Sequence, residues 1–407
     1  MTPSRISVAR EEPTYRSPTV RPTRLQQASA RPQPLPTDDT INRKAKMSQL
    51  GQAPQLRQND PWYAPLSVDM ILKVLNITLL HPFVAWIIPL CFRAEHHAWD
   101  TRPMMVSIAW ATLVTLTYAA NIVSHKLAYG MHREVDLSEE VIVITGGASG
   151  LGLLIAEVYG MRGATVAVLD VADRLENTEG RGITYYKCDV GDKKRVQEVA
   201  AEIERDLGTP TILINNAAQV IGKRLLDMST EEVERSLRTN LLAHFYTIKT
   251  FLPGMLQSET GGTIVTVSSV LGALGAAQLT DYTAAKAGAA ALHKSLAAEL
   301  RASAPEVKMV LVTLGQLGTP LFEGVDQPHS FLAPVVEPVD VAREVIKAID
   351  LGVSDHVGMP LYARWIDWYN VLPVGLQRLM RDFSGIDRGM RTWVGRSGGA
   401  EKGEKSI

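Results

Sequence analysis

From Glu139 onward, short runs of apolar and β-branched residues alternate with longer segments of helical composition. The predicted strands are Val141–Thr145, Ala164–Asp170, Ile183–Val190, Thr211–Ile214, Thr263–Val267 and Val307–Thr313. Strands that alternate with helices in this way pair in parallel, because each helix supplies the crossover that two parallel neighbours need. The sequence therefore predicts an α/β fold with a doubly wound parallel sheet over residues 138–360.

Composition limits what else the chain can be. The formal net charge is −1, so a global field for nucleic acid is not implied, and no nucleic-acid partner is expected. The two cysteines, Cys91 and Cys188, form neither a C-x-x-C motif nor a disulfide framework, which fits a reducing compartment. No metal site is predicted.

Residues 1–60 interleave prolines with arginines and contain few large apolar side chains. Such a segment cannot bury enough surface to offset its ordering entropy, so we predict a disordered basic tail. A transit peptide is the alternative, but Glu11, Glu12 and the prolines argue against an amphipathic helix.

Two apolar stretches follow the tail. Residues 104–123 carry no charge, and residues 70–92 carry one, Lys73. A membrane span needs about 20 mostly apolar residues, so residues 66–130 are predicted to form a membrane anchor of one or two helices. His81-Pro82 interrupts the first stretch. Basic flanks on both sides suit a hairpin with its ends in the cytosol. The alternative is a pair of buried core helices.

A glycine-rich turn joins the first predicted strand to the next helix. Gly146, Gly150 and Gly152 allow close backbone approach to a pyrophosphate, and the helix N-terminus adds N–H donors. Asp170 ends the second strand 18 residues after Gly152, where a carboxylate can accept both ribose hydroxyls. This arrangement is typical of a Rossmann-type fold and favours NAD, with NADP possible. The alternative is that Asp170 only caps the turn.

Tyr282 and Lys286 lie four residues apart on a predicted Ala-rich helix, so they share one face. An ammonium beside a phenol favours the phenolate, and the pair is predicted to exchange a proton with an alcohol or ketone. Ser269 ends a strand thirteen residues earlier and could bind the same oxygen. Ser268 is its neighbour on the opposite strand face. Two solvated side chains are the alternative interpretation of the Tyr–Lys spacing.

Residues 138–360 resemble the short-chain dehydrogenase/reductase family. The motifs T-G-x-x-x-G-x-G at residues 145–152, N-N-A at residues 215–217 and Y-x-x-x-K at residues 282–286 occur in the family's order. The resemblance implies an NAD(P)-binding catalytic domain. The implied catalytic residues are Asn240, Ser269, Tyr282 and Lys286. The implied cofactor-binding residues are Gly146, Ser149, Gly150, Leu151, Gly152, Asp170, Asp189, Val190, Asn216, Ala217, Tyr282, Lys286 and Thr319.

Two positions depart from the family pattern. Ala218 stands where the family often has glycine, and Leu314 replaces the usual proline before Gly315. The second change puts the geometry of that loop in question.

The anchored N-terminus looks like the membrane-bound branch of the family, which acts on retinoids, steroids and other lipids. We therefore expect a membrane-bound oxidoreductase for a small hydrophobic alcohol, ketone or aldehyde. It is expected in the endoplasmic reticulum or a lipid-droplet type of membrane, with the catalytic domain facing the cytosol. A homodimer through residues 231–252 and 281–301 is also implied. The alternatives are a catalytically silent scaffold and a soluble enzyme whose apolar segments bind a partner.

The substrate wall is predicted to include the loop Gly318–Pro334, with Leu321, Phe322, Phe331 and Leu332. Residues 361–407 are predicted to form a helical tail that frays after Gly395. That tail could lie at a membrane interface or cover the domain.

Overall fold

The computed structural model describes residues 66–130, 132–172, 182–325 and 331–394 of the 407-residue chain. The predicted disordered tail and the predicted frayed end lie outside the described residues, so both stay predictions.

A seven-stranded sheet forms the centre of the catalytic region, and every neighbouring pair of strands is parallel. Its strands are β1 (Val141–Thr145), β2 (Thr165–Asp170), β3 (Ile183–Lys187), β4 (Ile212–Asn215), β5 (Gly262–Ser269), β6 (Val307–Leu314) and β7 (Asp355–Met359). Their order is β3-β2-β1-β4-β5-β6-β7. The winding reverses between β1 and β4, which is where such sheets bind ligands at the carboxyl ends of their strands. The predicted fold class is confirmed.

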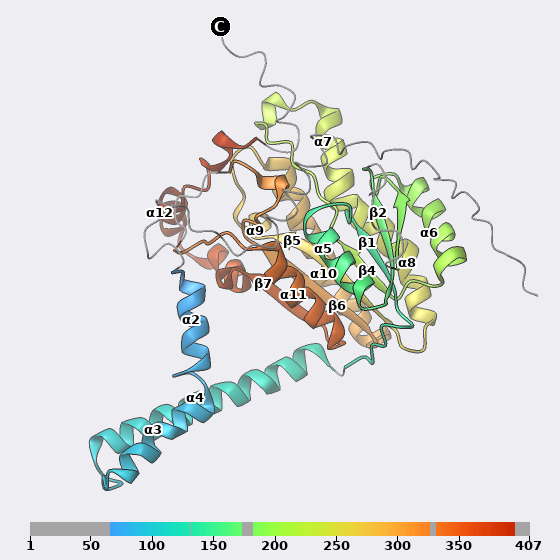
Figure 1. Ribbon diagram of the computed structural model, residues 1–407. Coiled ribbons are helices and arrows are strands. Elements are labelled where there is room, and N and C mark those ends of the chain that lie inside the picture. The colour runs from blue at the N-terminus through green and yellow to red at the C-terminus, as the bar shows by residue number, and fades with distance from the viewer. Residues whose placement is uncertain (1–65, 131, 173–181, 326–330, 395–407) are drawn as a thin grey trace, which may run out of the picture. The chain divides into compact units, whose positions relative to one another are not determined.

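Helices cover both faces of this sheet (Figure 1). On one face lie α5 (Gly150–Met161) and α11 (Pro338–Asp350). On the other lie α6 (Lys193–Leu207), α8 (Ala243–Gln257) and α10 (Thr280–Ser303). Within β1 every residue is buried, because alternate side chains enter the two separate cores.

The sequence predicts one long helix from about Glu231 to Leu252, and in the structure this region is divided into three segments. It begins as α7 (Thr230–Leu237), where Ser229 and Glu232 form a capping box. It then widens into a π-helical turn, η2 (Arg238–Leu242), before α8 continues. Single π turns inside helices are often found at functional sites, and this one contains Asn240.

The N-terminal apolar region forms α2 (Val68–Ile77), α3 (Pro82–Ala94) and α4 (Arg102–Tyr129). Within the described ranges, α4 is the one helix that by itself is long and apolar enough to cross a membrane. α2 and α3 pass that test only together, as a pair bent by 58°. Only 17% of the most apolar part of α4 is buried, so α4 differs from the buried core helix of the alternative interpretation.

The chain after β7 returns to the carboxyl ends of the strands as η4 (Leu361–Val371), α12 (Val374–Ser384) and η5 (Gly389–Thr392). The short elements η1 (Leu225–Asp227), α9 (Leu271–Leu274) and η3 (Pro320–Phe322) lie in the loops that follow β4, β5 and β6. α2 is tied to this region, because Asp69 Oδ2 accepts a hydrogen bond from the Leu361 N–H at 2.7 Å.

Candidate functional site

The glycine-rich turn after β1 is packed so closely that a side chain is excluded at Gly146 and Gly152. A Cβ on Gly152 would lie 2.5 Å from the Gly146 carbonyl oxygen and 2.7 Å from Asn216 Nδ2. Gly146 itself has a φ of +66°, and a Cβ there would lie 2.7 Å from Ala217 Cα. Asn216 Nδ2 donates to the carbonyl oxygens of Thr145 and Gly146 at 3.1 and 3.0 Å. Asn216, the middle residue of the N-N-A motif, thus fixes the shape of the turn.

Gly152→Ala is therefore expected to weaken cofactor binding and to destabilise the fold by about 1–3 kcal/mol, the usual cost of overpacking. Gly375→Ala is the matched control, because a Cβ at Gly375 meets nothing within 4 Å. Titration of NAD and NADP, combined with thermal unfolding, would measure both effects. Equal behaviour of the two variants would show that the close packing at Gly152 is unimportant.

A cavity of about 500 Å³ opens beside this turn at the carboxyl ends of the strands. Every residue predicted to contact the cofactor lines it except Gly152, which packs behind the turn. These are Gly146, Ser149, Gly150, Leu151, Asp170, Asp189, Val190, Asn216, Ala217, Tyr282, Lys286 and Thr319. The close-packed glycines of the turn and the cavity beside it fit a dinucleotide, and we call this space the cofactor cavity.

Asp170 does two things at the end of β2. Its carboxylate is buried and accepts hydrogen bonds from the N–H groups of Ala148 at 2.9 Å and Ala172 at 3.1 Å. It also lines the cofactor cavity. Because a carboxylate has about four acceptor sites, capping the turn leaves capacity for ribose hydroxyls. Asp170 therefore caps the turn, and its position in the cofactor cavity is also compatible with binding the ribose.

Tyr282 and Lys286 lie in the first two turns of α10, and both side chains are buried. Lys286 Nζ is 5.8 Å from the centre of the Tyr282 ring and donates to the Val267 carbonyl oxygen at 2.8 Å. Ser269 Oγ donates to the Leu314 carbonyl oxygen and accepts from the Leu271 N–H, both at 3.2 Å. All three predicted residues line the cofactor cavity.

Ser268 also lines the cofactor cavity, but its hydroxyl is used differently. Ser268 Oγ donates to the main-chain carbonyl of Lys286 at 3.0 Å, which fixes β5 to α10. Ser269 lines a second cavity as well, and Ser268 does not. The geometry favours Ser269 over Ser268 as the residue that meets a substrate.

The electrostatics of the pair differ from the sequence-based expectation. Burial raises the pKa of Tyr282 above the ordinary phenol value, while interaction with the Ser269 hydroxyl opposes the rise. Burial also lowers the pKa of Lys286 to about 8. The net pKa shift of Tyr282 in the protein without cofactor is therefore upward, opposite to the lowered value expected from Lys286, because desolvation dominates. Tyr282 holds its proton at neutral pH in this state.

Asn240 lies behind the cofactor cavity wall and does not line it. Its side chain is fully buried. Asn240 Oδ1 accepts from the Gln219 N–H at 3.0 Å, and Nδ2 donates to the Gln219 carbonyl at 2.9 Å and to Ser236 Oγ at 3.1 Å. Because Gln219 does line the cavity, Asn240 fixes the main chain of the cavity wall.

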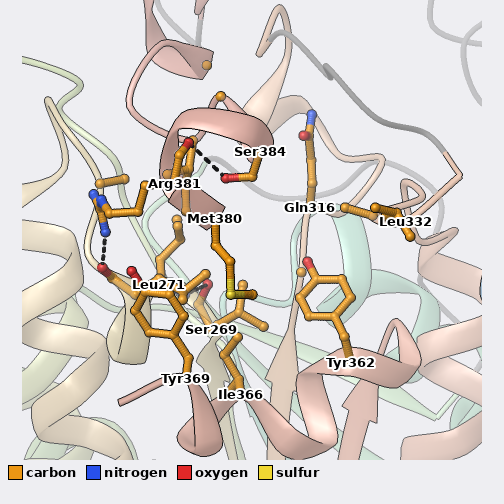
Figure 2. A pocket seen from close by; sticks show the side chains of 18 of the residues that line it. Ser269, Leu271, Gln316, Leu332, Tyr362, Ile366, Tyr369, Met380, Arg381 and Ser384 are labelled. Carbon is orange, nitrogen blue, oxygen red and sulfur yellow. Dashed lines mark hydrogen bonds between the residues drawn. The ribbon is translucent and has the colours of Figure 1, made fainter. Parts of the chain in front are cut away.

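A second cavity, of about 660 Å³ and mostly apolar lining, adjoins the first and is called the substrate cavity here (Figure 2). The two share Ser269, Gly315 and Phe322. Figure 2 shows Tyr362, Ile366 and Tyr369 of η4 on one side of this space and Met380 of α12 reaching toward them from the other side.

The sequence predicted only part of the wall of the substrate cavity. Phe322 and Leu332 line it, whereas Leu321 lines the cofactor cavity and Phe331 is exposed. The contributions of α2, η4 and α12 were missed. The signal that could have indicated the last two was the density of aromatic and apolar residues between positions 361 and 394.

The loop after β6 keeps its geometry although Leu314 replaces proline. The Gly315 N–H donates to the Met359 carbonyl at 2.8 Å, which continues the pairing of β6 with β7. A Cβ on Gly315 would lie 2.6 Å from Pro360 Cδ and 2.8 Å from Tyr362 Oη. Glycine is therefore required at position 315, at the junction of the two cavities.

Comparison with known proteins identifies the family of the chain. The family model described as short chain dehydrogenase matches residues 140–329. Short-chain dehydrogenase/reductase 3 of Homo sapiens is 33% identical over 270 residues, which are 64% of this chain and 89% of that protein. Epidermal retinol dehydrogenase 2 of Homo sapiens is 31% identical over 274 residues, 64% of this chain and 86% of the relative.

An uncharacterized oxidoreductase of Saccharomyces cerevisiae is 32% identical over 252 residues, covering 60% of this chain and 82% of that one. Among solved structures, the ligand-free aldohexose dehydrogenase of Thermoplasma acidophilum matches 55% of this chain and 92% of its own. Its sequence identity is 24% and its TM-score is 0.48.

Proposed function

The chain belongs to the short-chain dehydrogenase/reductase family and is an NAD(P)-dependent oxidoreductase for CH–OH groups, and from this premise we propose that its substrate is a hydrophobic alcohol–carbonyl pair. Retinoids, steroids and other lipids are the proposed classes. The observation that carries the proposal is the apolar substrate cavity, which shares Ser269 with the cofactor cavity. The names of the retinol dehydrogenases among its relatives support the same class.

The bound nicotinamide would supply or accept the hydride. In reduction, Tyr282 would donate its phenolic proton to the substrate oxygen as that oxygen gains charge. Ser269 would hold the same oxygen by a hydrogen bond. Tyr282 is protonated in the free protein, so a proton is available for this step, while burial raises the pKa of the phenol and makes it a weaker acid than an ordinary tyrosine.

Lys286 and Asn240 would act around this proton transfer. The buried ammonium of Lys286, when charged, would favour loss of the proton from Tyr282, and it would also bind the ribose beside the nicotinamide. The family resemblance gives Asn240 a water in a proton relay. Because its side chain is engaged by Gln219 and Ser236, such a water would be held by the main chain of η2.

Asp170→Ala is expected to weaken NAD binding about tenfold or more, the size of a lost hydrogen bond to a charged group. NADP should lose less, because the carboxylate no longer repels its 2′-phosphate. Asp170→Asn is the matched variant that keeps the shape and removes the charge, and it should shift the preference toward NADP. Titration of both cofactors measures this, and equal losses would mean that Asp170 is only a turn cap.

We also propose attachment to a membrane through α4, with the catalytic domain on the cytosolic side of the endoplasmic reticulum or a lipid droplet. The length and exposure of α4 support attachment. Full-length protein should sediment with membranes after an alkaline wash. Recovery of the protein in the soluble fraction would favour the alternative in which the apolar hairpin binds a partner.

The proposed homodimer would form through α7–α8 and α10. Ala284, Ala287 and Ala291 form an exposed small-residue face on α10, which supports close approach of a second helix. Gly288 does not belong to that face, because a Cβ there would lie 3.0 Å from Leu241 of the same chain.

Purified full-length protein should be assayed with NAD and NADP against retinol, retinal, a hydroxysteroid and a ketosteroid. We expect turnover with at least one pair of these substrates. Cofactor binding without turnover on any of them would favour the second candidate, a catalytically silent scaffold. The intact Ser–Tyr–Lys arrangement argues against that candidate.

A further inference from the structure

Helix α12 presents apolar side chains outward, while two of its polar residues, Gln377 and Arg381, are partly buried against the protein. The apolar residues Leu376, Leu379 and Phe383 recur at helical spacing and are 45%, 67% and 60% exposed. On the other face, Arg381 donates to the Leu274 carbonyl and forms an ion pair with Asp387, both at 2.5 Å. A helix that covers a soluble core normally buries its apolar stripe, so this arrangement needs a partner that is itself apolar.

The same exposure continues on two neighbouring elements. In η4, Trp365 and Trp368 are 58% and 71% exposed, and in α2 the apolar side chains are also turned outward. We call this combined surface the apolar rim. Its residues are Met70, Ile71, Val74, Ile77, Trp365, Trp368, Val371, Leu376, Leu379, Met380 and Phe383. Scattered exposed apolar residues are ordinary, but a continuous group of this kind marks an interaction surface.

The apolar rim belongs to the same elements that enclose the substrate cavity. Trp365, Trp368 and Phe383 line the cavity and are also exposed. Figure 2 shows that Met380 and Arg381 leave α12 in different directions. Met380 enters the cavity, and Arg381 points toward its hydrogen-bond acceptor, the Leu274 carbonyl. Whatever covers the apolar rim therefore also lies against the walls of the substrate cavity.

The connection from α2 to α3 and α4 favours a membrane as the partner of the apolar rim. Only four residues separate the end of α2 from the start of α3, which leads into α4. Four residues span at most about 14 Å, so α2 cannot lie far from the surface of a membrane that holds this hairpin. The exposed tryptophans suit the boundary between lipid and water, where their rings are enriched.

We propose that the apolar rim docks onto the membrane that holds α4, so that the substrate cavity receives its substrate from lipid rather than from water. This inference rests on the membrane attachment and the lipid substrate of the proposed function. A second copy of the chain or another protein could cover the apolar rim instead. The membrane is favoured because α2 is joined directly to the membrane segment.

The test uses the full-length chain in phosphatidylcholine vesicles, with an environment-sensitive fluorophore on one cysteine at a time. Cys91→Ser and Cys188→Ala remove the native thiols. Leu379→Cys places the probe on the apolar rim, and Arg378→Cys is the control at an exposed polar position of the same helix, about 100° around its axis. Leu116→Cys, on the exposed surface of α4, reports the anchor.

We expect lipids brominated near the headgroups to remove most of the emission of the probe at position 379 and little of that at position 378. Lipids brominated at mid-chain should quench the probe at position 116. Quenching at position 116 but not at position 379 would overturn the docking and leave the anchor intact. A blue-shifted but unquenched probe at position 379 would assign the surface to a protein. Failure to quench at every position would instead contradict the membrane attachment.

Discussion

Tyr282→Phe is expected to lower kcat by about 10³-fold, within the range of general acid–base contributions, while cofactor affinity stays nearly unchanged. The substitution removes one hydroxyl from a fully enclosed ring and little volume, so the walls of both cavities should be preserved. The buried phenol holds the proton that the substrate oxygen needs, and no other phenol lines the cofactor cavity among the described residues. Single-turnover kinetics with bound cofactor would measure the loss in the chemical step.

Tyr186→Phe is the matched control for this variant. Tyr186 is a buried tyrosine of β3 that lines neither cavity, so its loss of a hydroxyl should leave turnover intact. Substantial turnover by Tyr282→Phe would reject Tyr282 as the acid. A loss of cofactor binding in the same variant would mean that the ring is structural.

Lys286→Met should damage both turnover and cofactor affinity, because the ammonium is assigned to the phenol and to the ribose. The substitution should also change the pH dependence of kcat/KM. Burial lowers the pKa of Lys286 to about 8, so the charged form in the free enzyme is lost as the pH rises through that value. We expect kcat/KM for reduction to fall above about pH 8, and this limb should be absent in Lys286→Met.

Lys308→Met controls for removal of a partly enclosed lysine remote from the cavities, where Nζ donates to the Pro305 carbonyl. This variant should keep the fall of kcat/KM above about pH 8, and its cofactor affinity should be unchanged. Lys286→Met could instead lose only cofactor affinity and keep the fall of kcat/KM above about pH 8. That fall would then belong to another group, and the electrostatic role assigned to Lys286 would be wrong.

Local patterns were sufficient to predict the sheet and the cofactor cavity. The glycines, Asp170 and the Tyr–Lys pair lie at the ends of strands and the starts of helices, and the parallel fold brings those ends together at one edge. Spacing therefore identified the glycines, Asp170 and the Tyr–Lys pair, whereas Asp189, Val190, Asn216, Ala217 and Thr319 were implied by the family resemblance.

The substrate cavity could not be predicted in the same way. Its walls depend on contacts such as that between Asp69 and Leu361, which are 292 residues apart in the chain and carry no shared periodicity. The π turn at Asn240 was missed because the flanking sequence has continuous helical character. The direction of the Tyr282 pKa shift was wrong because helical spacing reports proximity to Lys286 but not the depth of burial.

On the proposed function, this chain transfers a hydride between a nicotinamide cofactor and the carbinol carbon of a hydrophobic substrate. The most direct measurement supplies reduced cofactor with both C4 hydrogens replaced by deuterium, together with retinal or a ketosteroid, and examines the product alcohol by mass spectrometry. We expect one deuterium on the carbinol carbon of the product from the wild-type enzyme and almost none from Tyr282→Phe. Cofactor that binds to the wild-type protein but transfers no deuterium to any of these carbonyl substrates would contradict the proposed function.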